Sequence, residues 1–372
     1  MIIGFDMYPQ LIFKTGVRVV IDNLLTTMRQ RYPEHRFVEL RPQVGPLSTS
    51  RHSYGRKIFN HVQRLVWTQV ELPVKARQAN CDLLFCTCMF SPYIQPLPTV
   101  TLLYDLAIWR HPEWYPMPWR WINRLFAELP AHLNSHITTI SEDARKDIIE
   151  LFGISAERVS SIHLGLDMPE VAPSDDTAVL NQYDIPPDAP YILYMGPAIG
   201  HKNLPALVTA FGQLTRRLPD QPFYLVIGGP ATNTHGKDAL ASVRVAATSA
   251  GVSDRLRFTG FMPRAHVPIL YRNALIYAFP SLFEGFGLPM IEAMANGTPV
   301  VSSDRTSLPE IGGDAAIYFD PQNIENMTNA LYLVATQPAL RCEMAHRGRE
   351  RARLFTWDRT ADAYMQLFLR LT

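Results

Sequence analysis

The sequence lacks several features that would place it in a specialised class of protein. No apolar run reaches the roughly 18 residues that a membrane-crossing helix needs, and Met1–Asp6 shows no basic leader followed by an apolar segment. Net charge is close to zero, with 35 Lys and Arg against 34 Asp and Glu, so global charge does not favour nucleic acid. We therefore expect a cytoplasmic protein that binds no nucleic acid.

Two chemical signatures are also missing. The four cysteines have no metal-binding spacing, since Cys81, Cys86 and Cys88 crowd one region and Cys342 stands apart. We interpret them as reduced core thiols and expect no metal site. After a first strand predicted over 2–8, the loop is too long and too poor in glycine for a dinucleotide fingerprint. A dehydrogenase is therefore disfavoured.

What is present is a globular composition with a repeated alternation of elements. The chain has 372 residues, 47% apolar and 19% charged, enough for two domains that each bury a core. Short apolar runs alternate with helical stretches in both halves, which predicts parallel sheets with helices on both faces. The expected strands are 2–8, 36–41, 83–86, 99–103, 136–140, 159–166, 191–195, 223–227, 256–258, 275–279, 298–301 and 316–319.

These elements predict an α/β fold of two doubly wound, Rossmann-like domains facing across a cleft. The first domain is expected over 1–170 and the second over 191–355. The polar, Pro- and Asp-rich stretch 171–190 is interpreted as the linker.

One stretch, 280–293, carries a ligand-binding pattern. An apolar strand precedes it and a helix follows, and Pro289 suits the first helical position because its missing N–H costs nothing there. The N-terminus of such a helix attracts phosphate, and Gly285 and Gly287 would let an anion come close to the backbone.

Two glutamates stand in the same stretch. A carboxylate repels phosphate but accepts hydrogen bonds from vicinal hydroxyls, so Glu284 and Glu292 would reach opposite ends of one ligand, a sugar nucleotide. The plainer interpretation stays open, because glycine-rich turns and glutamates near helix starts are common in α/β proteins.

Two further candidates follow expected strands. Lys202, after strand 191–195, is placed to neutralise phosphate charge on a leaving group, although a surface lysine would look the same. Asp105, after strand 99–103, lies where doubly wound sheets bind ligands, or it caps the next element. The aromatic segment 109–121, which includes His111, suits sugar stacking or ordinary packing.

The stretch 51–77 is basic and amphipathic, with six Lys or Arg against Glu71. It suits contact with an anionic membrane surface, or a solvated helix packed on its own domain.

Taken together, these motifs resemble the retaining glycosyltransferases of family 4, which have the two-domain GT-B fold. The residues that carry the resemblance are Thr15–Val17, Tyr104–Asp105, His111–Trp114, Ser141–Glu142, Ile162–Asp167, His201–Asn203, Pro280–Gly287 and Leu308–Glu310. They span most of the chain in the family's order.

The resemblance implies roles for individual residues. Glu292 would hold the ribose hydroxyls and Glu284 those of the transferred sugar, while Lys202 would bind the diphosphate. Gly16 would meet the diphosphate from the other domain, and Phe286, Gly287 and Leu288 would offer backbone amides. The family uses no catalytic metal, and its last helix, here 356–372, crosses back onto the first domain.

Two departures from the family pattern affect these roles. The family often has His-Asp where this chain has Tyr104–Asp105, so Tyr104 or His111 would have to replace that histidine near the sugar. The family also tends to have Arg before the lysine, where this chain has His201, a residue whose charge depends on pH.

The expected reaction is transfer of a hexose from a nucleoside diphosphate sugar to a hydroxyl of a saccharide or lipid-linked saccharide, with retention and without metal. The motifs are reminiscent of mannosyl- and rhamnosyl-transferring members that build surface polysaccharides, so GDP-mannose is the first expected donor and UDP-glucose the second. Two alternatives remain. They are a sugar-nucleotide isomerase of the 2-epimerase type and a non-catalytic subunit that kept the fold.

Overall fold

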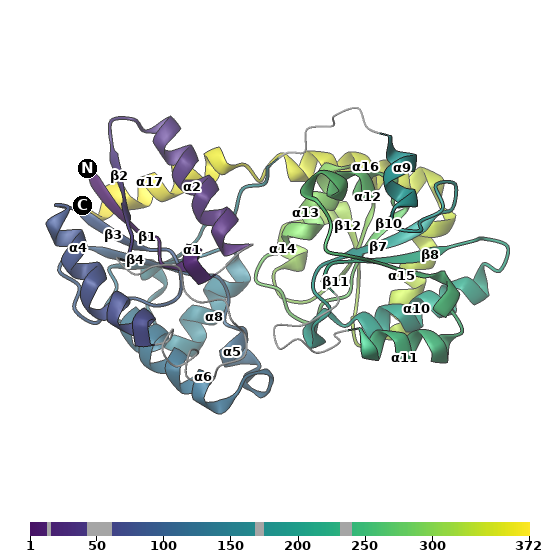
Figure 1. Ribbon diagram of the computed structural model, residues 1–372, viewed down its shortest axis with the longest axis horizontal. Helices are drawn as coiled ribbons and strands as arrows, with labels where there is room; N and C mark the ends of the chain where they lie inside the picture. Colours follow the sequence, from purple (N-terminus) through teal and green to yellow (C-terminus); the bar gives the residue numbers. More distant parts are fainter. Residues whose placement is uncertain (13–15, 43–61, 168–174, 231–239) are drawn as a thin grey trace. The chain divides into compact units, whose positions relative to one another are not determined.

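The computed structural model describes residues 1–12, 16–42, 62–167, 175–230 and 240–372 (Figure 1). Thr15 and the part of the basic stretch before residue 62 lie outside them. The chain divides into a first unit, Met1–Gly165 with Phe355–Thr372, and a second unit, Leu166–Leu354. Each unit has its own sheet.

The sheet of the first unit has six parallel strands in the order β2-β1-β3-β4-β5-β6. The central strands β3 and β4 are buried at every position, as expected of a sheet covered by helices on either side. The strands are β1 Ile2–Asp6, β2 Arg36–Leu40, β3 Leu83–Cys86, β4 Thr99–Leu103, β5 His136–Thr139 and β6 Val159–Ser161.

The second sheet also has six parallel strands, in the order β12-β11-β10-β7-β8-β9. Counted from its own first strand this is the order 3-2-1-4-5-6 of dinucleotide-binding domains, which reverses direction between β7 and β10. The strands are β7 Tyr191–Met195, β8 Tyr224–Gly228, β9 Leu256–Gly260, β10 Ile276–Phe279, β11 Val300–Ser303 and β12 Ala316–Phe319.

Helices connect the strands of the first unit. In α8, Ser141 accepts a hydrogen bond from the Ala144 N–H at 3.2 Å and so caps the helix, and left-handed Gly153 ends it. The helical elements are α1 Pro9–Ile12, α2 Val17–Arg31, 62–66, η1 Trp67–Glu71, α4 Leu72–Gln78, α5 Ala107–Arg110, η2 Pro112–Trp114, α6 Met117–Asn123, η3 Arg124–Glu128, α7 Leu129–Ala131, α8 Glu142–Phe152 and η4 Ala156–Arg158.

The C-terminal helix α17, Trp357–Leu371, belongs to the first unit and packs against α2. The Tyr364 ring lies 5.1 Å from that of Phe85 on β3. A Cβ at Gly165 would stand 2.3 Å from the Trp357 nitrogen, so only glycine fits where the returning chain passes. The predicted return of the last helix to the first domain is therefore confirmed.

The second unit alternates strands and helices in the same way. Helix α10 is amphipathic and buries one side against α11 and α15. The helical elements are α9 Asp176–Asn181, η5 Gly200–Lys202, α10 Leu204–Arg217, α11 Ala241–Ala250, η6 Ser253–Arg255, η7 Arg264–His266, α12 Val267–Asn273, α13 Leu288–Ala295, α14 Leu308–Gly312, η8 Gly313–Ala315, α15 Ile324–Thr336 and α16 Pro338–Ala352.

Three expectations differ from the structure. The stretch 171–190 is more than a linker, because α9 forms within it and Asp176 pairs with Arg272 of the second unit. The strand predicted over 159–166 ends at Ser161. Cys342 is exposed, whereas the other three cysteines are buried.

Candidate functional site

The predicted donor residues gather at the ends of two neighbouring strands in the second unit. β7 and β10 pair in parallel at the point where the strand order reverses, and ligands of doubly wound sheets bind beyond the carboxyl ends at such a point. The segments that leave the two strands also touch, because the Leu282 N–H donates to the His201 carbonyl oxygen at 2.7 Å. The fold therefore brings Lys202 and Glu284 to one place.

Lys202 and Glu284 form an ion pair. The lysine Nζ donates to Glu284 Oε1 at 2.6 Å, and the two side chains are only 14% and 12% exposed. At this depth a charge without a partner is costly, so each group stabilises the charge of the other. The pair offers one cation for phosphate and one carboxylate for hydroxyl groups.

The loop that carries Glu284 is held by two hydroxyl side chains. Thr306 Oγ1 accepts from the Glu284 N–H and lies 3.0 Å from the Glu284 carbonyl oxygen, to which it donates. Ser307 Oγ lies 2.9 Å from the same carbonyl and 3.0 Å from that of Phe286. Thr306 has a φ of 52°, which is unusual for a β-branched residue and marks a site where the surroundings impose the backbone.

The sequence analysis missed Thr306 and Ser307. A signal was present, because both hydroxyl residues stand directly before Leu308–Glu310, a segment that it did single out. The local sequence does not show that their hydroxyls contact the loop at Glu284, about twenty residues earlier in the chain.

The same loop leads into α13. Gly287 has a φ of 113°, and a Cβ there would lie 2.9 Å from Leu308 Cδ2, so the position requires glycine. Helix α13 begins at Leu288, one residue before the predicted start at Pro289. Phe286 is buried, and Gly285 lies between it and Glu284. In the first turn of α13, Pro289 has no N–H and the Met290 N–H donates to the Gly287 carbonyl oxygen at 2.9 Å, so the amides that can meet an anion are those before Pro289.

Glu292 lies on α13, where one of its carboxylate oxygens accepts a hydrogen bond from the Tyr271 hydroxyl at 3.0 Å. Burial raises the pKa of the Glu292 carboxyl, and the Tyr271 hydrogen bond opposes that rise. Tyr271 is fully buried on α12, and burial raises its own pKa well above the ordinary value. Tyr271 is a third residue that the sequence did not predict, and nothing in the local pattern marks it.

The predicted residues of the first unit have local partners. Asp105 accepts from the Ala107 N–H at 2.9 Å, which is the capping role left open for it. His111 Nδ1 lies 3.1 Å from Glu113 Oε1, and its ring stacks on Trp114 at 3.9 Å. Gly16 has a φ of 47° and precedes α2, with open space where a Cβ would stand.

Of the two candidates to replace the family histidine, Tyr104 has its hydroxyl occupied. That hydroxyl points at the Thr87 carbonyl oxygen at 3.4 Å, and burial raises its pKa well above the ordinary value. His111 is 35% exposed and presents an ionisable ring to solvent.

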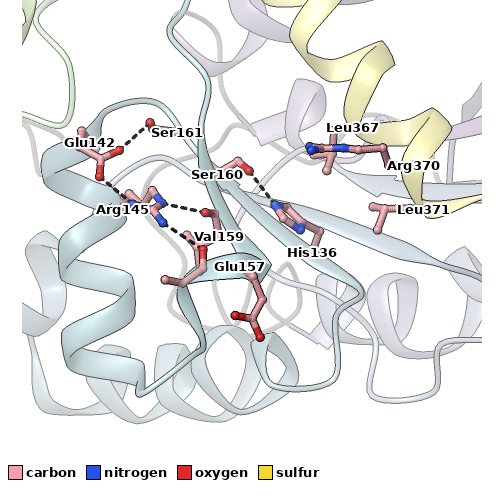
Figure 2. Close-up of a pocket in the computed structure, with 11 residues that line it drawn as sticks. His136, Glu142, Arg145, Glu157, Val159, Ser160, Ser161, Leu367, Arg370 and Leu371 are labelled. Carbon is pink, nitrogen blue, oxygen red and sulfur yellow. Dashed lines mark hydrogen bonds and ion pairs between the residues drawn. The ribbon is translucent and has the colours of Figure 1, made fainter.

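A cavity of about 570 Å³ in the first unit contains none of the predicted site residues (Figure 2). It lies along the edge strand β6, between α8 and α17. Figure 2 shows separate contacts among several of its polar groups: Arg145 binds Glu142 and the Val159 carbonyl oxygen, and His136 faces Ser160. These contacts close the edge of the sheet, so we assign the cavity a structural origin.

Among the described residues, no three His, Cys, Asp or Glu side chains gather as they would around a metal ion. The candidate site consists of Lys202, Glu284, the loop from Glu284 to Leu288, and Glu292, all in the second unit.

Comparison with known proteins gives two family matches that together span most of the chain. Residues 14–169 match "Glycosyltransferase Family 4", and residues 175–353 match "Glycosyl transferases group 1".

Individual relatives agree with these matches. O-antigen chain mannosyltransferase B of Escherichia coli is 30% identical over 276 residues, which cover 72% of this chain and 70% of the relative. D-inositol 3-phosphate glycosyltransferase of Kribbella flavida is 28% identical over 237 residues, 62% of this chain and 55% of the relative. Sucrose-phosphate synthase from Thermosynechococcus elongatus is similar in fold, with a TM-score of 0.76 at 19% identity over 100% of this chain and 99% of that one.

Proposed function

Because the chain belongs to glycosyltransferase family 4 and has the two-domain α/β GT-B fold, we propose that it transfers a hexose from a nucleoside diphosphate sugar to a hydroxyl of a saccharide or lipid-linked saccharide. The first proposed donor is GDP-mannose, supported by the Escherichia coli mannosyltransferase relative. The observation that carries the proposal is the Lys202–Glu284 pair at the reversal point of the second sheet.

In the proposed donor complex, Lys202 and Glu284 separate and bind different parts of the donor. The Lys202 ammonium turns from Glu284 to the diphosphate, and the freed Glu284 carboxylate accepts hydrogen bonds from hydroxyls of the sugar. The amides of Phe286, Gly287 and Leu288 add donors at the start of α13. Glu292 takes the ribose hydroxyls while Tyr271 fixes its carboxylate.

The proposed chemistry retains the anomeric configuration. The bond from the anomeric carbon to the phosphate oxygen breaks, and the acceptor oxygen bonds to the same face of that carbon. The acceptor's proton passes to the leaving diphosphate, so no enzymic nucleophile is needed. Lys202 and the α13 amides stabilise the charge that grows on the diphosphate, which is why we propose a reaction without a metal ion. Turnover that persists in EDTA would support this step.

His201, Gly16, Asp105 and His111 keep their proposed roles around the donor and acceptor. His201 lies in η5 directly before Lys202, and its protonation would add a second positive charge near the diphosphate.

The first experiment is a thermal-shift screen against a panel of sugar nucleotides. A donor at 100 times its dissociation constant stabilises the protein by about 2.7 kcal/mol, which identifies base and sugar together. Incubation with the donor alone, analysed for an epimerised product, separates a transferase from an isomerase. Calorimetry that detects no donor binding would favour a non-catalytic subunit.

The second experiment removes the two carboxylates. Glu284→Ala and Glu292→Ala each delete a charged hydrogen-bonding group, worth about 1.5–3 kcal/mol, and we expect donor turnover to fall roughly 10- to 150-fold in each. Unchanged turnover in both variants would contradict the assignment.

The proposed location is the cytoplasm, peripheral on the inner face of the membrane, with the basic stretch 51–77 as the contact first considered. In the part of the chain that the structure describes, no helix combines the length and apolarity needed to cross a bilayer.

A further inference from the structure

The helical segment 62–78 exposes apolar side chains on its outer face. The outward positions hold Val62, Val66, Val70 and Val74, which are 51%, 45%, 57% and 48% exposed. The inner face is apolar too, since Trp67 and other core residues lie on it. A surface helix of a globular domain normally has an apolar face toward the core and a polar face toward solvent. This segment is apolar on both faces.

A second helical segment, from α6 through η3 to α7, shows the same pattern. Met117, Trp121, Leu125 and Leu129 are 59%, 55%, 43% and 42% exposed, and Leu133 follows after four more residues at 55%. Scattered exposed apolar residues are ordinary, but two rows at one fixed spacing are not.

Both rows depend on a π-helical turn. Residues four apart drift around an α-helix by about 40° at each step, so a long row would wind away from one side. Each segment contains one π-helical turn, η1 or η3, in which more residues complete a turn and the drift is corrected. The two rows therefore keep facing outward along their length.

The loop between β3 and β4 joins the two rows into one surface. Gln69 Oε1 accepts from the Tyr93 N–H at 3.0 Å, and the Tyr93 hydroxyl donates to the Leu125 carbonyl oxygen. The Phe90 ring packs near those of Trp119 and Phe126. Ile94, next to Tyr93, is 75% exposed. We call this surface the apolar face; it comprises Val62, Val66, Val70, Val74, Ile94, Met117, Trp121, Leu125, Leu129 and Leu133.

Positive charge borders the apolar face. The Arg124 guanidinium lies 5.8 Å from the Trp121 ring centre, and Arg120 lies one turn away. These three residues help line a shallow cavity of about 370 Å³. Lys75 and Arg77 follow the valine row. The bordering acids are fewer, and Glu128 accepts a hydrogen bond from the Trp109 indole at 2.8 Å.

We propose that the apolar face docks the first unit onto an anionic lipid bilayer, with Arg120 and Arg124 against headgroup phosphates. Exposed tryptophan and leucine beside arginine are the residues that bind at the membrane interface, where rings and aliphatic chains enter the headgroup region. Membrane contact thus relies on apolar side chains and adds the segment 117–133 to the basic stretch. The inference rests on the proposed function in one respect: a lipid-linked acceptor would lie at that surface.

The test is co-sedimentation of the full chain with vesicles of phosphatidylglycerol and phosphatidylcholine, compared with vesicles of phosphatidylcholine alone. Val66→Thr with Val70→Thr keeps the shape of the side chains, and Trp121→Gln with Leu125→Gln removes the second row. Each pair should lower the partition coefficient roughly tenfold, because apolar area no longer leaves water on docking. Arg120→Gln with Arg124→Gln should remove the preference for anionic vesicles.

Matched controls lie in the second unit. Val245 on α11 is 68% exposed and Phe261 after β9 is 85% exposed, so both are single apolar residues outside the apolar face. Val245→Thr and Phe261→Gln should leave vesicle binding unchanged. Circular dichroism of every variant shows whether the fold is retained.

Three results would overturn the proposal. They are no vesicle binding by the native chain, equal binding by the native chain and all three pairs of substitutions, and self-association that the same substitutions abolish while vesicles are ignored. Donor binding measured by calorimetry without vesicles should be equal in all these variants. Its absence in the native chain, with vesicle binding intact, would count against the proposed function alone.

Discussion

The two units differ in how they bind the carboxylate nearest the point where the strand order of their sheet reverses. In the first unit, Asp6 ends β1 beside β3, and its Oδ1 accepts from the Tyr8 N–H at 3.0 Å and the Trp67 indole at 2.8 Å. In the second, Glu284 follows β10 beside β7 and is paired with the flexible side chain of Lys202. A carboxylate that an indole and a main-chain amide already satisfy serves the fold, whereas a carboxylate with a movable cation can exchange its partner for a ligand.

The two reversal points therefore differ in the residues that fill them. The first unit fills its reversal point with its own side chains and turns apolar residues outward. The second unit keeps glycines and exchangeable charges at the same topological position.

The largest effect concerns two buried ionisable groups of the first unit. Burial raises the pKa of Asp6 from its ordinary value of 3.8 to about 6, and burial together with nearby arginines lowers the pKa of His136 from 6.5 to about 4. Between pH 4 and 6 the folded Asp6 keeps a proton that the unfolded chain loses, so stability falls as pH rises. Folded His136 lacks a proton that the unfolded chain gains, so its contribution to stability rises with pH.

The two contributions are each about 3 kcal/mol and cancel across that range. Compared with the native chain, Asp6→Asn should make stability rise more steeply from pH 4 to 6, and His136→Gln should make it fall. All six tryptophans belong to the first unit, so urea unfolding followed by tryptophan fluorescence reports on that unit alone. Identical pH slopes in both variants would refute the opposing contributions.

The next effect tests how the second unit holds its exchangeable carboxylate. Thr306→Val removes the hydroxyl that bonds both the N–H and the carbonyl of Glu284, which should cost about 1–3 kcal/mol in kcat/KM because the loop loses its position. Thr306→Ser keeps the hydroxyl and should restore donor affinity, measured by calorimetry.

Thr209 provides a matched control for this substitution. Its hydroxyl bonds the Pro205 carbonyl oxygen within α10, so Thr209→Val changes the same chemical group away from the site. Equal losses of donor affinity in the two valine variants would show that Thr306 acts on stability and not on the Glu284 loop.

The sequence predicts individual strands and individual site residues, but it does not predict the contacts between them. Strands 83–86, 99–103 and 191–195 are confirmed to the residue, because parallel strands that are buried on both faces are mostly apolar runs. Strand 316–319 is also confirmed to the residue, although it lies at the edge of its sheet and is only partly buried. Lys202 and Glu284 were identified singly, but their contact joins residues 82 apart and depends on β7 lying beside β10. That neighbourhood follows from the order of the whole sheet, which no local pattern contains.

Tertiary contacts also explain the elements that were missed. Helix α9 lies in a Pro- and Asp-rich stretch that is typical of a linker, yet the Asp175 cap and the pairing of Asp176 with Arg272 stabilise it. Asp6 and His136 looked like ordinary strand residues, since burial and not residue type shifts their pKa values.

A smaller effect concerns the second glutamate. Tyr271→Phe removes the hydroxyl that holds the Glu292 carboxylate, at about 1 kcal/mol, so donor KM should rise several-fold. That hydrogen bond lowers the pKa of Glu292, so its loss raises the pKa. As the pH falls, donor binding by the variant should therefore begin to weaken at a higher pH than donor binding by the native chain. Tyr277→Phe, in a buried ring 5.5 Å away, is the control and should leave this pH limit in place.

The smallest effect lies where the last helix meets the first unit. Asp362 on α17 accepts from Arg31 at 2.8 Å and from the Tyr32 hydroxyl at 2.7 Å, but its side chain is 35% exposed and that of Arg31 is 38% exposed. Solvent screens such pairs, so Asp362→Asn should cost less than about 1 kcal/mol in urea unfolding, and less still at high salt. Asp358, which is 63% exposed and also pairs with Arg31, should matter less again. Because the apolar contacts of Tyr364 and Phe368 with Phe85 carry most of this interface, a loss well above that value would mean that charge, and not core packing, fixes the returning helix.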